Sequence, residues 1–202
     1  NVEMLHIISI NQIANKEFST ALELTKQQKM KTYIVLLRGI NVSGKNKLPM
    51  SALREVLNEM GFQNVQTYIQ SGNILLDTDE EKVMITQKIR EAIALKFGYD
   101  VPVIIRTIDE WKKAIQNYPF SLENEKIVAF TFLDTPVEEQ KIEVNGIKED
   151  QYQINKDIIY LHCPSGFADT KLTNNLFEKK LKVIATSRNL RTTLKLLELT
   201  KT

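Results

Sequence analysis

The first strong pattern along the chain is a continuous apolar run that is followed by a helical periodicity. Residues 33–38 are nearly all apolar, which is typical of a buried central strand. Pro49 then opens a helix, because proline is favoured in the first helical turn, and Gly61 ends it where glycine is common. The apolar residues of this helix recur at the spacing of one buried face: Leu53, Val56, Leu57 and Met60.

Two short strand patterns come next, over residues 65–70 and 73–77. Ser71 and Gly72 separate them. A connection of this length predicts a β-hairpin with a two-residue turn, so the two strands run antiparallel.

A second helix and a fourth strand complete this part of the chain. Residues 80–97 carry isoleucines on one helical stripe, and Gly98 follows as a stop signal. Residues 101–106 form a strand pattern in which Pro102 favours an edge position, since proline cannot donate to a sheet ladder. The order of elements is therefore β-α-β-β-α-β, which is the ferredoxin-like arrangement.

The same order recurs after a helical connection over residues 108–117. The recurring elements are a strand over 127–133, a helix over 137–144, strands over 151–155 and 158–162, a helix over 172–181, a short strand over 183–185 and a last helix over 189–199. The sequence thus predicts an α+β protein with two ferredoxin-like halves, each with an antiparallel sheet, plus a C-terminal helix.

These patterns divide the chain into four parts. The first half spans residues 30–107, a connecting helix and loop spans 108–126, and the second half with its C-terminal helix spans 127–202. Residues 1–29 lie before Met30 and carry only a weak helical pattern over 17–29. We interpret them as a leader or extension of doubtful origin.

Composition excludes several classes of protein. Apolar residues make up 43% of the chain and charged residues 26%, which is ordinary for a globular protein. Cys163 stands alone, so no internal disulfide can form and no Cys/His cluster of zinc type exists. The sequence shows neither a signal peptide nor a membrane span. We therefore expect a cytoplasmic protein without a metal.

Charge is distributed unevenly along the chain. The net charge is +2, but residues 171–202 hold eight Lys or Arg against Glu178 and Glu198, a local balance of +6. This asymmetry makes nucleic acid an alternative partner for the basic C-terminal helices, although a solvated helix face explains the same pattern.

The handedness of the first β-α-β crossover brings polar residues to one edge of the predicted sheet. The end of the first strand, the start of the first helix and the hairpin turn must share that edge. The helix N-terminus there favours an anion. The candidate ligand-binding residues are Arg38, Asn41, Lys45, Lys47, Gln70, Ser71 and Asn73. Arg106, at the end of the fourth strand, belongs to the opposite edge.

Residues Gly39 to Lys45 also match the G-x-x-x-x-G-K pattern of a phosphate-binding loop. Asn46 stands where that motif needs a Ser or Thr for magnesium, and Pro49 interrupts the expected helix. Asp77, the residue that would complete an ATPase signature, lies on an antiparallel strand and at the far edge. The pattern therefore does not indicate a P-loop enzyme.

Secondary ligand candidates lie before the last two helices. They are Lys171, Thr173, Asn174, Asn175, Arg188 and Asn189. Their Thr and Asn side chains also suit helix caps, whereas Arg188 opposes the dipole of the helix it was expected to begin and is better suited to hold an anion. Catalytic residues cannot be identified: His162 beside Cys163 is better explained as a packed histidine than as a nucleophile pair.

Four segments together resemble a known family. They are Leu36 to Val42, Thr67 to Asn73, Lys171 to Asn175 and Ala185 to Asn189, in this order. They are similar to the successive signatures of the bacterial domain-of-unknown-function family numbered 1697, and the resemblance runs from about Met30 to Leu199. It implies a small cytoplasmic two-part α+β protein, and it implies no activity, cofactor or catalytic residue.

The sequence therefore favours a binding protein for a small phosphorylated or carboxylated ligand, held at the edge formed by residues 38–47 and 70–73. Nucleic-acid binding through the basic C-terminal helices is one alternative. An enzyme acting on a nucleotide or sugar phosphate is another, without an identified base. Cofactors and oligomeric state stay open.

Overall fold

A computed structural model describes residues 30–42, 44 and 46–201. Lys31–Thr202 form one compact unit. The weak helix expected over 17–29 and the candidate ligand residue Lys45 lie outside the described residues.

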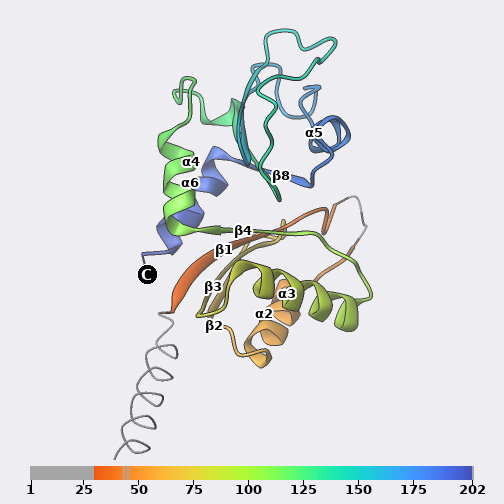
Figure 1. The fold of residues 1–202 in the computed structure, drawn as a ribbon, viewed down its shortest axis with the longest axis vertical. Helices are drawn as coiled ribbons and strands as arrows, with labels where there is room; N and C mark the ends of the chain where they lie inside the picture. Colours follow the sequence, from red (N-terminus) through yellow and green to blue (C-terminus); the bar gives the residue numbers. More distant parts are fainter. Residues whose placement is uncertain (1–29, 43, 45, 202) are drawn as a thin grey trace, which may run out of the picture. The chain divides into compact units, whose positions relative to one another are not determined.

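The first half is a four-stranded antiparallel sheet in the order β2-β3-β1-β4. Its elements are β1 Lys31–Leu37, α2 Met50–Glu59, β2 Gln63–Tyr68, β3 Asn73–Thr78, α3 Lys82–Phe97 and β4 Val103–Thr107. α2 and α3 lie on one face of this sheet (Figure 1). The ferredoxin-like order and the edge position of β4 are as the sequence predicted.

The second half repeats this topology in the order β6-β7-β5-β8. Its elements are η1 Glu125–Ile127, β5 Val128–Leu133, β6 Gln151–Asn155, β7 Ile158–His162, α5 Asn174–Leu181, β8 Ala185–Asn189 and α6 Leu190–Leu199. The fold class is thereby confirmed.

The repeat extends to a helix that follows each edge strand directly. α4, Ile108–Gln116, starts immediately after β4, and α6 starts immediately after β8. Thr107 caps α4 through a reciprocal pair of bonds with Glu110, while the Asn189 side chain caps α6. α4 and α6 lie side by side (Figure 1).

Strand alternation divides the apolar residues among three cores. Val35 of β1 points toward α2 and α3, whereas its neighbour Leu36 points toward the second half. Phe132 of β5 lies in the same central core as Leu36, and Leu133 lies in the third core under α5. The two sheets therefore share a central core that belongs to both halves.

The helix expected over residues 137–144 is wrong, because residues 134–150 are irregular. Val137, Ile142 and Val144 lie at spacings that do not repeat as one helical face, yet they still pack against the third core. Tyr152 holds this segment, since its hydroxyl accepts from Ile142 N–H at 2.9 Å and donates to Ile142 C=O at 2.5 Å. The segment covers the sheet as α2 does in the first half.

Other boundaries also differ from the sequence prediction: β2 is Gln63–Tyr68 and not residues 65–70, and α5 begins at Asn174 and not at residue 172. The β2–β3 connection has four residues, 69–72, and not two. The last strand is Ala185–Asn189 instead of residues 183–185, so Arg188 lies in a strand and not at a helix start. Residues 185–189 form the strand because they pair in register with β5, with Phe130 opposite Arg188.

We expect Gly72→Ala to destabilise the fold strongly. Gly72 has φ +75°, and a Cβ at this position would lie 2.6 Å from Leu37 Cβ. The left-handed backbone and the clash together should cost about 2 to 4 kcal/mol of unfolding free energy. Gly146→Ala is the matched control, because φ is +71° there and nothing lies within 4 Å, so about 1 to 2 kcal/mol should be lost. Urea unfolding of both variants measures the difference, and equal losses would contradict the clash.

Candidate functional site

The end of β1, the loop after it and the β2–β3 turn lie together in the part of the chain that the structure describes. The β1–β3 ladder pairs Leu36 with Asn73, so Arg38 follows β1 beside the β2–β3 turn. Arg106 pairs with Ile34 in the middle of β1, away from the strand end that Arg38 follows. Asn41 fastens the loop to the turn: its amide donates to Leu48 C=O at 3.0 Å and to Gln70 C=O at 2.9 Å.

Arg38 joins this edge to the second half. Its guanidinium makes two bonds to the Glu178 carboxylate, at 2.9 and 3.1 Å, and one to Asn175 Oδ1 at 2.7 Å. The two-bond geometry is the strong form of an arginine–carboxylate pair. The positive charge expected to attract a ligand is thus already balanced by α5.

Arg188 is buried between the halves, with 7% of its surface exposed. It donates six hydrogen bonds; the acceptors are Asn73 Oδ1, Thr186 Oγ1 and the carbonyls of Leu37, Ser71, Gly72 and Ser187. Burial, and to a smaller extent the charge of Arg38, lower the pKa of Arg188 to about 10. Arg188 therefore stays charged at neutral pH, and its donors are used within the protein.

Arg106 makes the reciprocal contact from the first half. Its guanidinium donates to Leu133 C=O at 2.6 Å and to Asp157 C=O at 3.0 Å, and it pairs with the Asp157 carboxylate at 3.1 Å. Leu133 and Asp157 correspond to Leu37 and Gly72 in the repeat. In each half the N–H group at the end of the central strand donates to the carbonyl of the turn, from Leu37 to Gly72 and from Leu133 to Asp157. Each half thus inserts an arginine into the strand end and turn of the other.

Sequence reasoning missed this role of Arg106. A signal was present in the chain, since Arg106-Thr107 and Arg188-Asn189 each end an edge strand with an arginine followed by a helix cap. Aligning the two halves on their strand order would have found the pair.

Three of the six secondary candidates, Thr173, Asn174 and Asn189, line a pocket of about 340 Å³ at the N-terminus of α5. Thr173, Asn174, Ser187 and Asn189 supply polar groups, and the remaining lining residues are Ala129, Leu161, Phe167, Thr170 and Leu172. None of these nine residues carries a charge. Lys171 and Asn175, also predicted, are exposed and do not line the pocket.

Two carboxamides in this pocket have their oxygens fixed. Asn174 Oδ1 accepts from Ser187 Oγ at 2.6 Å, and Asn189 Oδ1 accepts from Thr192 N–H at 2.9 Å. Their NH₂ groups donate to no other group in the part of the chain that the structure describes. The pocket therefore offers hydrogen-bond donors of fixed orientation.

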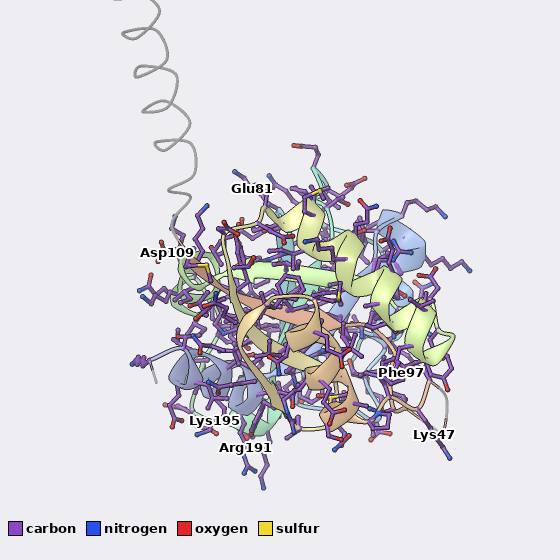
Figure 2. The ribbon with its side chains drawn as sticks, turned by 90° about the horizontal axis from the view of Figure 1, so that it is seen from below. Lys47, Glu81, Phe97, Asp109, Arg191 and Lys195 are labelled. Carbon is purple, nitrogen blue, oxygen red and sulfur yellow. The ribbon has the colours of Figure 1, made fainter. Side chains whose placement is uncertain are left out.

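The remaining predicted ligand residues have less to offer. Lys47 and Gln70 are exposed, and Figure 2 shows Lys47 apart from Arg191 and Lys195 of α6. Asn73 is fully buried, and its amide donates to Tyr68 C=O at 3.0 Å and to Ser71 Oγ at 2.9 Å. Ligand binding at this edge stays a prediction.

The described residues give little support for a nucleophile or a metal site. Cys163 is fully buried, and burial raises the pKa of its thiol to about 11, which keeps it protonated at neutral pH. Among the described residues, no group of three or more His, Cys, Asp or Glu side chains is arranged to hold a metal ion. Within the same residues, no helix is both long and apolar enough to cross a membrane.

The fold and the contacts of Arg106 and Arg188 define an α+β protein built from two ferredoxin-like halves, in which an arginine of each half is buried against the other half. The chain belongs to the family "Protein of unknown function (DUF1697)", which it matches over residues 30–160. It also resembles the solved structure of the conserved bacterial protein SP0830 from Streptococcus pneumoniae. That likeness has a TM-score of 0.61 at 24% identity and covers 86% of this chain and 100% of the other. It supports the fold alone. No curated protein matches the chain.

We expect Arg188→Lys to lower the unfolding free energy by about 2 to 4 kcal/mol. A single ammonium cannot reach six acceptors, so buried carbonyls lose their partners. Arg191→Lys is the control, because Arg191 is exposed on α6. Chemical denaturation measures both variants, and an Arg188→Lys protein as stable as the control would contradict the buried role.

Proposed function

We propose that this protein binds a small molecule with a carboxylate or phosphate group in the pocket at the N-terminus of α5. The observation that carries the proposal is the pair of unused NH₂ groups on Asn174 and Asn189, whose oxygens are held by Ser187 and by the first turn of α6. Donors fixed in this way favour a ligand that presents acceptors.

The surroundings suit a small anion. The pocket has no acidic lining residue, and at the start of α5 the N–H groups of Asn174 and Asn175 have no partner within the helix, whereas Leu176 N–H is capped by Thr173. Leu161, Leu172 and Phe167 give the ligand's carbon skeleton apolar contacts. The volume of about 340 Å³ lies at the lower end of the usual range for ligand sites, so we infer a ligand of metabolite size.

This proposal moves the ligand from the first half to the second. Arg38 was the leading candidate, but its charge is paired with Glu178. Asn41 and Asn73 hold the loop and the turn in place. An anion at that edge would have to compete with these contacts, whereas the α5 pocket requires no bond to be broken.

Nucleic-acid binding has less support. The local charge of +6 includes Arg188, which is buried. The other cations are divided between α5 and α6, and these helices pack against opposite faces of the second sheet, with Phe177 in one core and Leu196 in the other. Figure 2 shows Arg191 and Lys195 of α6 at the surface, but Lys195 is paired with Glu198 at 2.8 Å. A continuous basic stripe does not result.

The proposal keeps a cytoplasmic location and names neither a reaction nor a cofactor. Cys163 as a buried, unpaired thiol is consistent with a reducing compartment. A catalytic base near the pocket would be needed for an enzyme, and its lining residues are neutral.

We expect Asn189→Asp to weaken ligand binding while keeping the fold. Aspartate is as good a helix cap as asparagine, so the bond from Thr192 can persist. It replaces the NH₂ donor by a negative charge, which should weaken anion binding by about 10-fold to 100-fold. Thermal-shift titrations with inorganic phosphate, sugar phosphates, nucleotides and organic acids measure the effect.

Asn124→Asp is the matched control, since Asn124 caps η1 in the same way and is exposed outside the pocket. A ligand at one hundred times its dissociation constant should stabilise wild type and control by about 2.7 kcal/mol. The proposal fails if no compound in the panel stabilises the wild type, or if Asn189→Asp responds as the control does.

A further inference from the structure

A larger groove runs along the outer edge of β4. Its volume is about 820 Å³, and Val103, Ile104 and Ile105 lie on its floor. The solvent-facing side of α3 forms one wall, and Asp134 and Pro136 of the second half form the other. This groove shares no lining residue with the α5 pocket.

The main chain of β4 presents unpaired groups to the groove. Arg38 N–H bonds to Pro102 C=O at 2.9 Å, so the alternation of an antiparallel ladder turns Ile104 and Arg106 toward β1. Val103 and Ile105 therefore direct their N–H and C=O groups outward. The Ile105 carbonyl accepts from Arg106 Nη1 at 2.9 Å. Val103 N–H, Val103 C=O and Ile105 N–H have no partner within the described residues.

The equivalent edge of the second half is filled by the protein itself. Ala185 N–H, which corresponds to Val103 N–H, donates to Glu178 Oε1 at 3.0 Å. The Ser187 carbonyl accepts from Arg188 at 2.9 Å, as Ile105 does from Arg106. Arg38 then binds the same Glu178 carboxylate. The β8 edge is thus completed by the Glu178 carboxylate, which accepts from Ala185 N–H, and by Arg38, which neutralises that carboxylate.

The β4 edge lacks both of these groups. Asp134 occupies the position that Arg38 occupies in the other copy, since its N–H bonds to Ile184 C=O at 3.0 Å as Arg38 bonds to Pro102. The charge at this point of the repeat is therefore reversed. A group that completes the β4 edge would bring an acceptor to Val103 and a cation to Asp134.

The charges along the groove agree with a basic occupant. Arg90 is paired with Asp100, and Arg106 with Asp157. Lys82 is paired with Glu110, which lies outside the lining. Two acidic lining residues, Asp134 and Glu91, have no ion pair with any residue that the structure describes.

We propose that this groove binds an extended peptide segment of another protein, which adds a fifth strand beside β4 and places a Lys or Arg side chain against Asp134. Main-chain bonds to Val103 and Ile105 supply the docking, and the apolar floor accepts alternate side chains. A second copy of the chain fits less well through the same edge, because its β4 is equally recessed between α3 and Asp134.

The test uses an array of acetylated, amidated nine-residue peptides, with Val, Thr, Ile and Ser flanks and a central Arg, Lys, citrulline or Glu. We expect binding by the Arg and Lys peptides and at least about tenfold weaker binding by the Glu peptides. In ¹⁵N NMR titrations with the best binder, the Val103 and Ile105 amides should show the largest downfield shifts.

Asp134→Asn is the diagnostic variant, because its amide oxygen can still accept from Ile184 N–H. This substitution should lower the affinity for the Arg and Lys peptides by about threefold to fivefold and leave the affinity for the citrulline peptide unchanged. The exposed Asp79→Asn is the control. The proposal is overturned if basic centres give no advantage, if the Val103 and Ile105 amides do not respond, or if sedimentation shows that the edge is occupied by a second copy.

Discussion

Two buried arginines set the relation between the halves, and most other features depend on them. Arg106 and Arg188 occupy the same position in their edge strands, and each enters the end of the central strand and the turn of the opposite half. A buried guanidinium is costly unless its donors are satisfied. Main-chain carbonyls accept most of the bonds that cross between the halves, and Asn73 Oδ1 and the Asp157 carboxylate add side-chain acceptors. These bonds fix the two halves relative to each other.

The internal repeat makes the differences between the copies informative. The first half covers its sheet with α2, whereas residues 134–150 do the same without a helix. Glu178, paired with Arg38, fills the edge of β8, whereas Asp134 at the position corresponding to Arg38 leaves the edge of β4 open. A repeat of one architecture thus yields one edge that is closed by the chain and one that is available to a partner. The ligand pocket follows the same logic, since it depends on capping residues of the second half alone.

Much of the topology could be predicted from local patterns. Apolar runs and helical periodicity predicted the order of the elements in the first half, although several strand ends differ by about two residues. The structure of residues 137–144 was not predicted correctly, because their apolar side chains contact a core formed by strands distant in sequence. Arg188 was interpreted as a helix-start cation for a similar reason: five residues of edge strand directly before a helix carry too weak a pattern.

The sequence predicted which residue types could form the candidate site, but not which of them have free hydrogen-bonding groups. Asn, Thr and Arg residues were selected because they can hold an anion, and sequence alone cannot show which partners they already have. Arg38 and Arg188 proved to be bound within the protein, while Asn174 and Asn189 kept free donors. For the arginines that distinction depends on the packing of the second half against the first, and for the asparagines it depends on contacts within the second half; no local pattern contains either.

The central claim is that the halves unfold as one unit. Trp111, the single tryptophan, reports on their shared core, because it stacks on Phe132 with ring centroids 4.4 Å apart and donates to Thr193 C=O at 2.9 Å. Urea unfolding followed by Trp111 fluorescence and by far-ultraviolet circular dichroism tests the claim. The two transitions should coincide. A loss of the buried tryptophan signal at lower urea, with secondary structure retained, would contradict it.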